Sequence, residues 1–236
     1  MVKVELFQGD SIISAPEKVF DFGIPFTDTV LISFFISFLF LIFLFFVTFN
    51  LDLKSKRGFV AEMVYEVPMF LGKLALGEKA KKHISFIAAL LLYIFFANII
   101  GIFPIPMLSG GKIVDIKSPT SDLNSTVSLA IIAVGYITFH SIKSKGFINY
   151  LKSFLEPLPF LLPLNIIGEV AKPFSLAMRL FGNIFSGALI MALAYKYLPY
   201  VIPSFLHLYF DLFAGTIQSV IFVSLVTVYM SFALDD

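Results

Sequence analysis

The sequence lacks several features that soluble enzymes have. It contains no cysteine, which excludes a disulfide framework and a thiolate metal site. Charged residues make up only 14% of the 236 residues, whereas an ordinary soluble domain has about 25%. Apolar residues take their place, because 58% of the chain is hydrophobic and 30 residues are Phe. This composition predicts an all-α polytopic membrane protein.

Other absences exclude classes of function. No glycine-rich phosphate loop precedes a Lys-Ser or Lys-Thr pair, so we expect no direct nucleotide binding. The first 28 residues lack the basic start and small-residue cleavage site of a signal peptide, so we expect the mature chain to begin at Met1. The net charge of +1 says little about partners. We expect no nucleic-acid partner, no cofactor and no resident metal other than transient Na⁺.

Uncharged stretches locate the spans, because about 20 apolar residues cross the hydrocarbon core. They predict an N-terminal spanning helix, an upright spanning hairpin and two long apolar segments that exceed the bilayer thickness and must therefore tilt strongly. A Lys-rich stretch between the first two spans has apolar residues at helical spacing, which predicts an amphipathic surface helix. In one membrane domain we expect helices at 29–51, 58–80 (surface), 84–103, 122–145, 156–196 and 200–234, with a loop at 107–121.

The positions of Lys and Arg predict the orientation. Ten of them fall in loops on one side and five on the other, and the richer side of a membrane protein is the cytoplasmic one. We therefore expect the N-terminus outside and, after five crossings, the C-terminus in the cytoplasm.

Arg179 is the most informative residue, because it lies within apolar sequence. Only two of the 17 basic residues are Arg, and the other, Arg57, lies in a charged loop. Placing Arg at the centre of a membrane helix costs about 2.5–3.5 kcal/mol, so such a residue is a functional-site hypothesis by default. Structural alternatives are an internal ion pair with Asp211 or Glu169, or a side chain that snorkels from a tilted helix.

Polar and small residues extend from Arg179 along one helical face, and a second such stripe follows the last segment. The two stripes predict a hydrated path or an interface with another membrane protein. Asp211 and Gln218 could instead be interhelical contacts, and His207 could form a merely structural i, i+4 pair with Asp211. Asn98 and Asn124 fit helix-end or packing roles, and Asp122 is placed to cap the helix that it precedes. The stripes are Lys172, Ser175, Arg179, Gly182, Asn183, Ser186 and Ile190, and Ser204, His207, Asp211, Gly215 and Gln218.

Five sequence motifs resemble those of subunit a of bacterial rotary F-type ATP synthases. Any one of them would be a weak indication, but their order and spacing match from about residue 20 to the C-terminus. The motifs are Ile24–Thr29 (IPFTDT), Asn98–Pro104 (NIIGIFP), Pro119–Asn124 (PTSDLN), Lys172–Asn183 (KPFSLAMRLFGN) and Gly215–Phe222 (GTIQSVIF).

The resemblance implies that this chain is an ion-translocating stator subunit in a bacterial cytoplasmic membrane. Its partners would be a rotating ring of c subunits, the b subunits of the peripheral stalk and the remaining ATP synthase subunits, which carry out the nucleotide chemistry. The two tilted helices would face the ring, and Arg179 would face the ring carboxylate and separate two aqueous half-channels for H⁺ or Na⁺.

The resemblance also implies roles for residues near Arg179. Gln218 and Asn183 match positions next to the Arg, and Asp211 matches a residue of the outer half-channel. In many members the partner of that residue lies nine positions after the Arg, where this chain has Ala188. We infer that His207 replaces this partner.

Glu169 is a candidate for the cytoplasmic half-channel, although many members carry that carboxylate four residues earlier, where Asn165 stands here. Asp122, Ser175 and Ser186 complete the predicted ion pathway. The functional alternative is a stand-alone secondary transporter or antiporter, which should show inverted repeats that this sequence lacks. A purely structural scaffold would leave Arg179 and the stripes without a purpose.

Overall fold

The computed structural model describes residues 18–21, 25–48, 56–102, 106–109, 112–115, 118–155, 158–197, 205–206 and 208–235. Within these ranges, five helical segments are long and apolar enough to cross a membrane, which agrees with the predicted all-α polytopic class. The α-helices are α1 (Asp28–Thr48), α2 (Lys56–Leu76), α3 (Ala80–Ile99), α4 (Leu123–Lys145), α5 (Phe147–Ser153), α6 (Leu162–Tyr197) and α8 (Gly215–Asp235).

Shorter elements connect these helices. Single 3-10 turns are η1 (Gly77–Lys79), η2 (Ile100–Ile102), η3 (Pro119–Ser121) and η4 (Pro159–Leu161), and a π-helical segment, η5 (Leu208–Ala214), precedes α8. Two small antiparallel hairpins pair β1 (Lys18–Asp21) with β2 (Pro25–Thr27) and β3 (Pro106–Ser109) with β4 (Lys112–Asp115).

The second hairpin replaces most of the loop expected at 107–121. Ser109 pairs with Lys112 in this hairpin, and positions 110 and 111 between them lie outside the described residues. Both positions are Gly, and Gly-Gly between two strands indicates a hairpin from the sequence.

Specific residues set the ends of the helices. The Asp122 side chain accepts a hydrogen bond from the Asn124 backbone N–H at 3.0 Å and so caps α4, as predicted. The surface helix stops at Leu76 rather than at residue 80, because Gly77 adopts a left-handed φ of 56° that turns the chain toward α3. Gly146, with φ of 84°, ends α4 in the same way.

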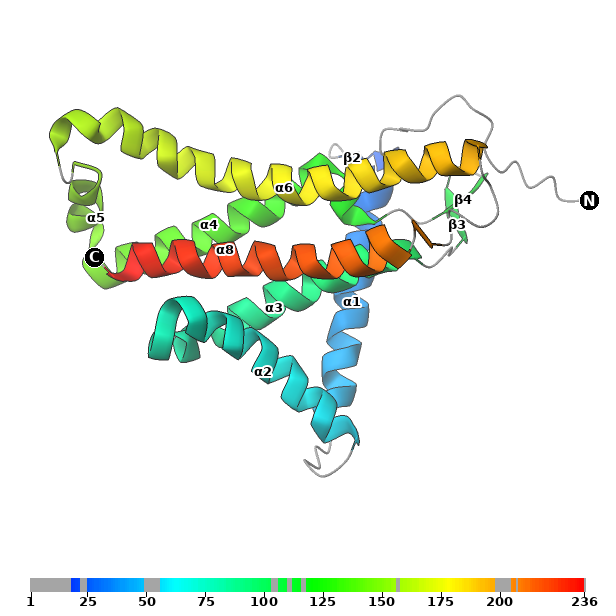
Figure 1. Ribbon diagram of the computed structural model, residues 1–236, viewed down its shortest axis with the longest axis horizontal. Coiled ribbons are helices and arrows are strands. Elements are labelled where there is room, and N and C mark those ends of the chain that lie inside the picture. The colour runs from blue at the N-terminus through cyan, green and yellow to red at the C-terminus, as the bar shows by residue number, and fades with distance from the viewer. Residues whose placement is uncertain are drawn as a thin grey trace, which may run out of the picture.

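The two long C-terminal segments run antiparallel and side by side, and α1 lies at a steep angle to both (Figure 1). Helix α6 has 36 residues and is therefore about 54 Å long, well beyond the roughly 30 Å of hydrocarbon. We expected one regular helix in the last segment. The structure has instead a π-helical turn, η5, followed by α8. Residues 156–157, 200–204 and 207 of the predicted segments lie outside the described residues.

The main core lies where α3, α4, α6 and α8 meet. Leu176 and Leu180 of α6 are buried there with Phe222 and Val226 of α8. Helix α1 is joined to the start of α4 by a 2.9 Å hydrogen bond from Thr29 Oγ1 to Asp122 Oδ2.

Several Lys-rich segments meet at one end of this bundle. Ser141 Oγ near the end of α4 donates to the Ala233 carbonyl at 3.0 Å, and Lys79 Nζ donates to the Leu234 carbonyl at 3.2 Å. The α2–α3 turn, the end of α4 and the C-terminal end of α8 therefore lie together (Figure 1).

Helix α2 leaves its apolar stripe uncovered. The apolar positions behind the prediction of a surface helix are Val60, Met63, Val64, Val67 and Phe70; Val64 is partly exposed and the other four are between 36% and 63% exposed. The side chains that α2 buries are others, namely Met69, Leu71 and Leu76. The stripe is thus free to lie against lipid, as expected of an amphipathic helix at a membrane surface.

Gly215 is required by the close approach of α3 to α8. A Cβ at Gly215 would lie 3.1 Å from Asn98 Cβ, and hydrogen bonds hold Asn98 in place. We expect Gly215→Ala to lower the free energy of unfolding by about 1–3 kcal/mol, as an overpacked helix contact does. Thermal unfolding of the detergent-solubilised protein, followed by helical circular dichroism, measures this.

Gly135→Ala is the matched control, because a Cβ there would meet nothing within 4 Å in α4. In an open helix position Ala is better than Gly by up to about 1 kcal/mol. If Gly215→Ala were as stable as Gly135→Ala, this result would contradict the close approach of α3 to α8 at Gly215.

Candidate functional site

Arg179 is exposed on the surface of α6, while its neighbours on the other face are buried. Leu176, Ala177 and Leu180 are at most 1% exposed and fix the helix against the bundle core. Among the described residues, no carboxylate forms a salt bridge with Arg179; the salt bridges there join Lys81 with Glu78 and Lys172 with Glu169. The guanidinium is therefore presented outward, without an internal counter-ion in the part of the chain that the structure describes.

The predicted stripe surrounds Arg179 on the same side of α6. Ser175 and Asn183 are partly exposed and Ser186 is exposed. The Ser186 hydroxyl donates to the Gly182 carbonyl. A Cβ at Gly182 would meet nothing within 4 Å, so this glycine serves no contact with the described residues of this chain.

Glu169, one of the two expected internal partners of Arg179, is engaged elsewhere. Its carboxylate pairs with the Lys172 ammonium one turn later on α6. Lys172 Nζ also lies 5.9 Å from the centre of the Tyr229 ring of α8, within cation–π range. The other expected partner, Asp211, has a side chain that lies outside the described residues.

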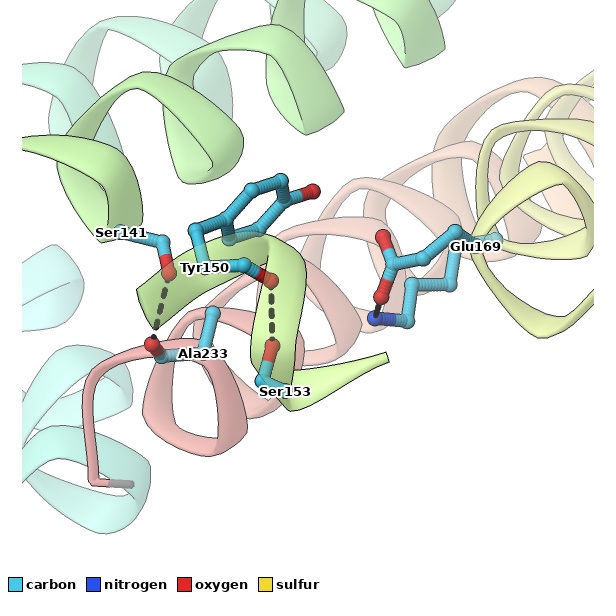
Figure 2. A network of polar contacts seen from close by, with 6 residues as sticks. Ser141, Tyr150, Ser153, Glu169 and Ala233 are labelled. Carbon is cyan, nitrogen blue, oxygen red and sulfur yellow. Dashed lines mark hydrogen bonds and ion pairs between the residues drawn. The ribbon is translucent and has the colours of Figure 1, made fainter. Parts of the chain in front are cut away.

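The Glu169–Lys172 pair lines a polar cleft of about 330 Å³ between the end of α4, α5, the first half of α6 and the end of α8. Figure 2 shows its floor, where Ser141 reaches the Ala233 carbonyl and Ser153 Oγ donates to the Tyr150 carbonyl at 2.8 Å. The side chains of Glu169 and Lys172 are 34% and 26% exposed. This inner cleft thus brings polar surface and a carboxylate to the first half of α6.

Hydroxyl and amide groups complete the inner cleft. Burial raises the pKa of the Tyr150 phenol, and the negative charge of Glu169 raises it further, although a hydrogen bond with Thr138 lowers it. Tyr150 therefore stays a neutral hydroxyl at neutral pH. Asn165, which stands where many members have a carboxylate, donates from Nδ2 to the Phe154 carbonyl at 2.8 Å.

Gln218 is buried on α8, only 6% exposed, and its Nε2 has no hydrogen-bond partner among the described residues. A buried donor without a partner is unusual in a folded protein and calls for an explanation such as a partner outside this chain. No hydrogen bond joins Gln218 to Arg179 within the described residues.

The π-helical segment η5 carries Asp211 and packs against α6 beyond Arg179. A Cβ at Gly187 of α6 would lie 3.2 Å from Phe210, so this glycine permits the contact. Ala188 follows Gly187 in the chain, and Asp211 follows Phe210. Ala188 and Asp211 are the two positions for which the resemblance implied paired residues, and His207 lies outside the described residues.

Asn98 fixes the junction between η5 and α8. Its Nδ2 donates to the Gly215 carbonyl at 2.9 Å, and its Oδ1 accepts from Thr120 Oγ1 at 2.7 Å. Ser118 Oγ lies 2.6 Å from Thr120 Oγ1 and donates to the Ala97 carbonyl at 2.6 Å. The predicted packing role of Asn98 agrees with this buried network.

A second cleft of about 560 Å³ opens between α1 and the start of α4, at the opposite end from the Lys-rich loops; its surface is mostly apolar, with polar groups along it. Asp122 lines it and is held there by its bonds to Thr29 and Asn124. Serines at helical spacing, Ser33 and Ser37 on α1 and Ser125 and Ser128 on α4, line the rest of its polar surface with Asn124. We call it the outer cleft.

Comparison with known proteins decides the family. The model of the family described as "ATP synthase A chain" matches residues 30–231. The chain belongs to this family. It is therefore an ion-translocating membrane subunit of an F-type ATP synthase.

Three relatives illustrate the similarity. "ATP synthase subunit a, sodium ion specific" of Propionigenium modestum is 38% identical over 223 residues, which cover 91% of this chain and 76% of the relative. "ATP synthase subunit a" of Macrococcus caseolyticus is 34% identical over 233 residues, 93% of both chains. That of Moorella thermoacetica is 29% identical over 218 residues, 92% of this chain and 95% of the relative. The stand-alone transporter alternative receives no support from these matches.

Sequence reasoning missed several polar groups of this family member. Ser33 and Ser37 share a helical spacing of four in the first span, and Ser125 and Ser128 a spacing of three. That spacing in apolar helices could have revealed the outer cleft. Tyr150 and Ser153 gave no such signal, because their approach to Glu169 depends on how α5 folds back.

The Glu169–Lys172 pair predicts a measurable coupling. Removing one partner leaves the other charge uncompensated in a partly buried cleft. We expect the Glu169→Gln and Lys172→Gln variants to show a coupling energy of about 1 kcal/mol in a double-mutant cycle of thermal stability.

Glu78 and Lys81 provide the control, because they have the same i, i+3 spacing but side chains 78% and 61% exposed. Exposed pairs typically contribute only about 0–1 kcal/mol, so this cycle should show a smaller coupling. Strict additivity at positions 169 and 172 would show that the pair in the inner cleft does not hold.

Proposed function

We propose that Arg179 is the fixed charge that faces the ring carboxylate of the c subunits and separates two half-channels. The observation that carries this proposal is the exposed guanidinium, which finds no internal counter-ion among the described residues. Leaving such a charge in lipid would cost about 2.5–3.5 kcal/mol or more. A carboxylate on another membrane subunit removes that cost, and the open surface at Gly182 leaves room for it.

The physical effect of Arg179 follows from the pKa of the ring carboxylate. In lipid a carboxyl group stays neutral or ion-bound, because burial disfavours its charge, whereas a nearby positive charge lowers its pKa. Each ring site that reaches Arg179 therefore releases its ion, and the next ion binds after the site has moved on. Because Arg keeps its proton, it also repels a cation that would leak directly between the half-channels.

The inner cleft, which is mostly polar, and the outer cleft, whose mostly apolar surface carries serine hydroxyls and Asp122, are the proposed half-channels. The inner cleft, with Glu169, reaches α6 two to three turns before Arg179. On the other side of Arg179, Asp211 on η5 would receive the ion, and Asp122 in the outer cleft would line the path from outside. Serine hydroxyls in the outer cleft supply the polar lining that water needs.

Gln218 and Asn183 are the proposed supports of Arg179. A guanidinium has no acceptor, so Gln218 can meet it only through Oε1. The unpaired Nε2 of Gln218 is then left to donate to the carboxylate of the ring. Ser175 and Ser186, one and two turns away on the same face of α6, would line the path on either side.

The chain would lie in a bacterial cytoplasmic membrane with its Lys-rich end in the cytoplasm. The C-terminus is then cytoplasmic and the N-terminus outside. The c ring and the b subunits of the peripheral stalk are the proposed contacts within the ATP synthase. The translocated ion is H⁺ or Na⁺; the relative from Propionigenium modestum is named sodium ion specific, and the c subunits are expected to set the selectivity.

Replacing Arg179 by Ala tests the central role. We expect ATP-driven ion uptake into inverted membrane vesicles to fall to background, because ring sites can no longer be forced to release their ion. Arg57→Ala is the matched control. Arg57 is the only other Arg of the sequence and was predicted outside the membrane region, so its removal should leave uptake unchanged. Normal uptake by an assembled Arg179→Ala complex would refute the role.

Asp211→Asn tests the outer half-channel. The amide cannot exchange an ion, so we expect slower ion flux with normal assembly, judged by co-purification with the c ring. If His207 assists Asp211, a cycle of His207→Ala and Asp211→Asn should be non-additive in flux. Unchanged flux in Asp211→Asn would remove this residue from the pathway, and additivity would argue against the His207 pairing.

A further inference from the structure

A cleft of about 480 Å³ at the Lys-rich end of the bundle belongs to neither half-channel. Two helical faces line it with the same spacing of i, i+3 and i+4. The first is Lys79, Lys82 and His83, and the second is His140, Lys143 and Ser144; Leu234 of α8 closes one side. None of the described lining residues is acidic. We call this the basic cleft.

The floor of the basic cleft is held by Tyr136. His83, 7% exposed, lies with Nδ1 3.0 Å from the Tyr136 hydroxyl. His140 Nδ1 lies 3.0 Å from the Tyr136 carbonyl, which can only accept, so this nitrogen carries a proton. The Tyr136 ring is stacked on Phe86 with centroids 3.7 Å apart, which fixes all three groups.

Among the described residues, two lysines of the basic cleft, Lys82 and Lys143, lack the salt bridges that nearby lysines form. Lys81 is paired with Glu78 at 2.6 Å, and Lys172 with Glu169. Lys82 and Lys143 are exposed, and neither has a salt bridge among the described residues. Like charges gathered in this way repel one another unless an anion lies between them.

The location indicates the kind of anion. The cleft lies where the spanning helices α3 and α4 begin and end, and basic pockets between such helices on the cytoplasmic side suit anionic headgroups. Phe139, 62% exposed, places its ring centre 5.3 Å from that of His140. An apolar surface for an acyl chain thus borders the charged cleft.

We propose that the basic cleft binds the phosphate headgroup of an anionic phospholipid. Lys82 and Lys143 supply the positive charge, His140 and Ser144 supply further polar groups, and the exposed side of α4 contacts the acyl chain. This site is independent of the role given to Arg179. Two other occupants share the same chemistry: free inorganic phosphate, and the carboxylates of Asp235 and Asp236, which follow Leu234 in the chain.

The test uses the whole ATP synthase complex in phosphatidylcholine vesicles that contain photoactivatable phosphatidylglycerol. After illumination, mass spectrometry measures the lipid attached to peptides that carry residues 79–83 or 139–144. We expect Lys82→Gln/Lys143→Gln to reduce this labelling by about 10-fold to 30-fold, because two lysines near a headgroup are removed. Lys82→Arg/Lys143→Arg keeps both charges and should retain the labelling.

The matched control is Lys73→Gln/Lys152→Gln. It removes two exposed lysines from the same end of the helix bundle but outside the cleft. This variant should be labelled normally, and co-purification of the c ring verifies assembly of every variant. Equal loss in both Gln pairs, or no loss in either, would overturn the proposal.

Two further arms separate the other occupants. Displacement of the lipid by inorganic phosphate would make free phosphate the occupant and overturn the proposal. Labelling that is absent in the full chain and arises only in Asp235→Asn/Asp236→Asn would show that the chain fills the cleft with its own C-terminus, which also contradicts it. Labelling of the unaltered complex that phosphate does not displace supports a lipid site.

Discussion

A permanent positive charge on the exposed face of a membrane-spanning helix is the constraint on which the rest of this structure depends. Arg179 keeps its proton, and no carboxylate among the described residues neutralises it. The nearest candidate on α6, Glu169, is paired with Lys172 instead. The charge is thus left without a counter-ion among the described residues. The proposed counter-ion is a carboxylate that another subunit brings, and a counter-ion that arrives and leaves is what a rotary mechanism needs.

The fold serves this charge by holding α6 firmly on one side and leaving it open on the other. Leu176, Ala177 and Leu180 anchor α6 in the core, so the face with Arg179 cannot turn inward. The length of α6, beyond what an upright span needs, lets one helix pass both the inner cleft and the contact with η5. Asn98, bonded to the Gly215 carbonyl, fixes the start of α8 beside it.

Much of this could be predicted from the sequence, because charge-free runs locate the spans and a charge within such a run is conspicuous. Asp122 as a helix cap followed from its residue type and place. The π-helical turn at 208–214 and the pair between Glu169 and Lys172 could not be predicted. The first depends on tertiary contacts with Gly187 and Asn98, and the second competed with equally possible partners at the same helical spacing. The short β3–β4 hairpin was missed because two adjacent glycines permit many turns.

The most direct test of the central claim is disulfide cross-linking to the ring, for which the chain is suited because it contains no cysteine. Asn183 lies one turn after Arg179 on the same face and is partly exposed, whereas Ala188 is exposed and lies on the opposite side of α6. A disulfide requires the two Cα atoms to lie within about 7 Å. With one cysteine beside the ring carboxylate, Asn183→Cys should form a cross-link to the c subunit and Ala188→Cys should not. A cross-link at Ala188 and none at Asn183 would contradict the account.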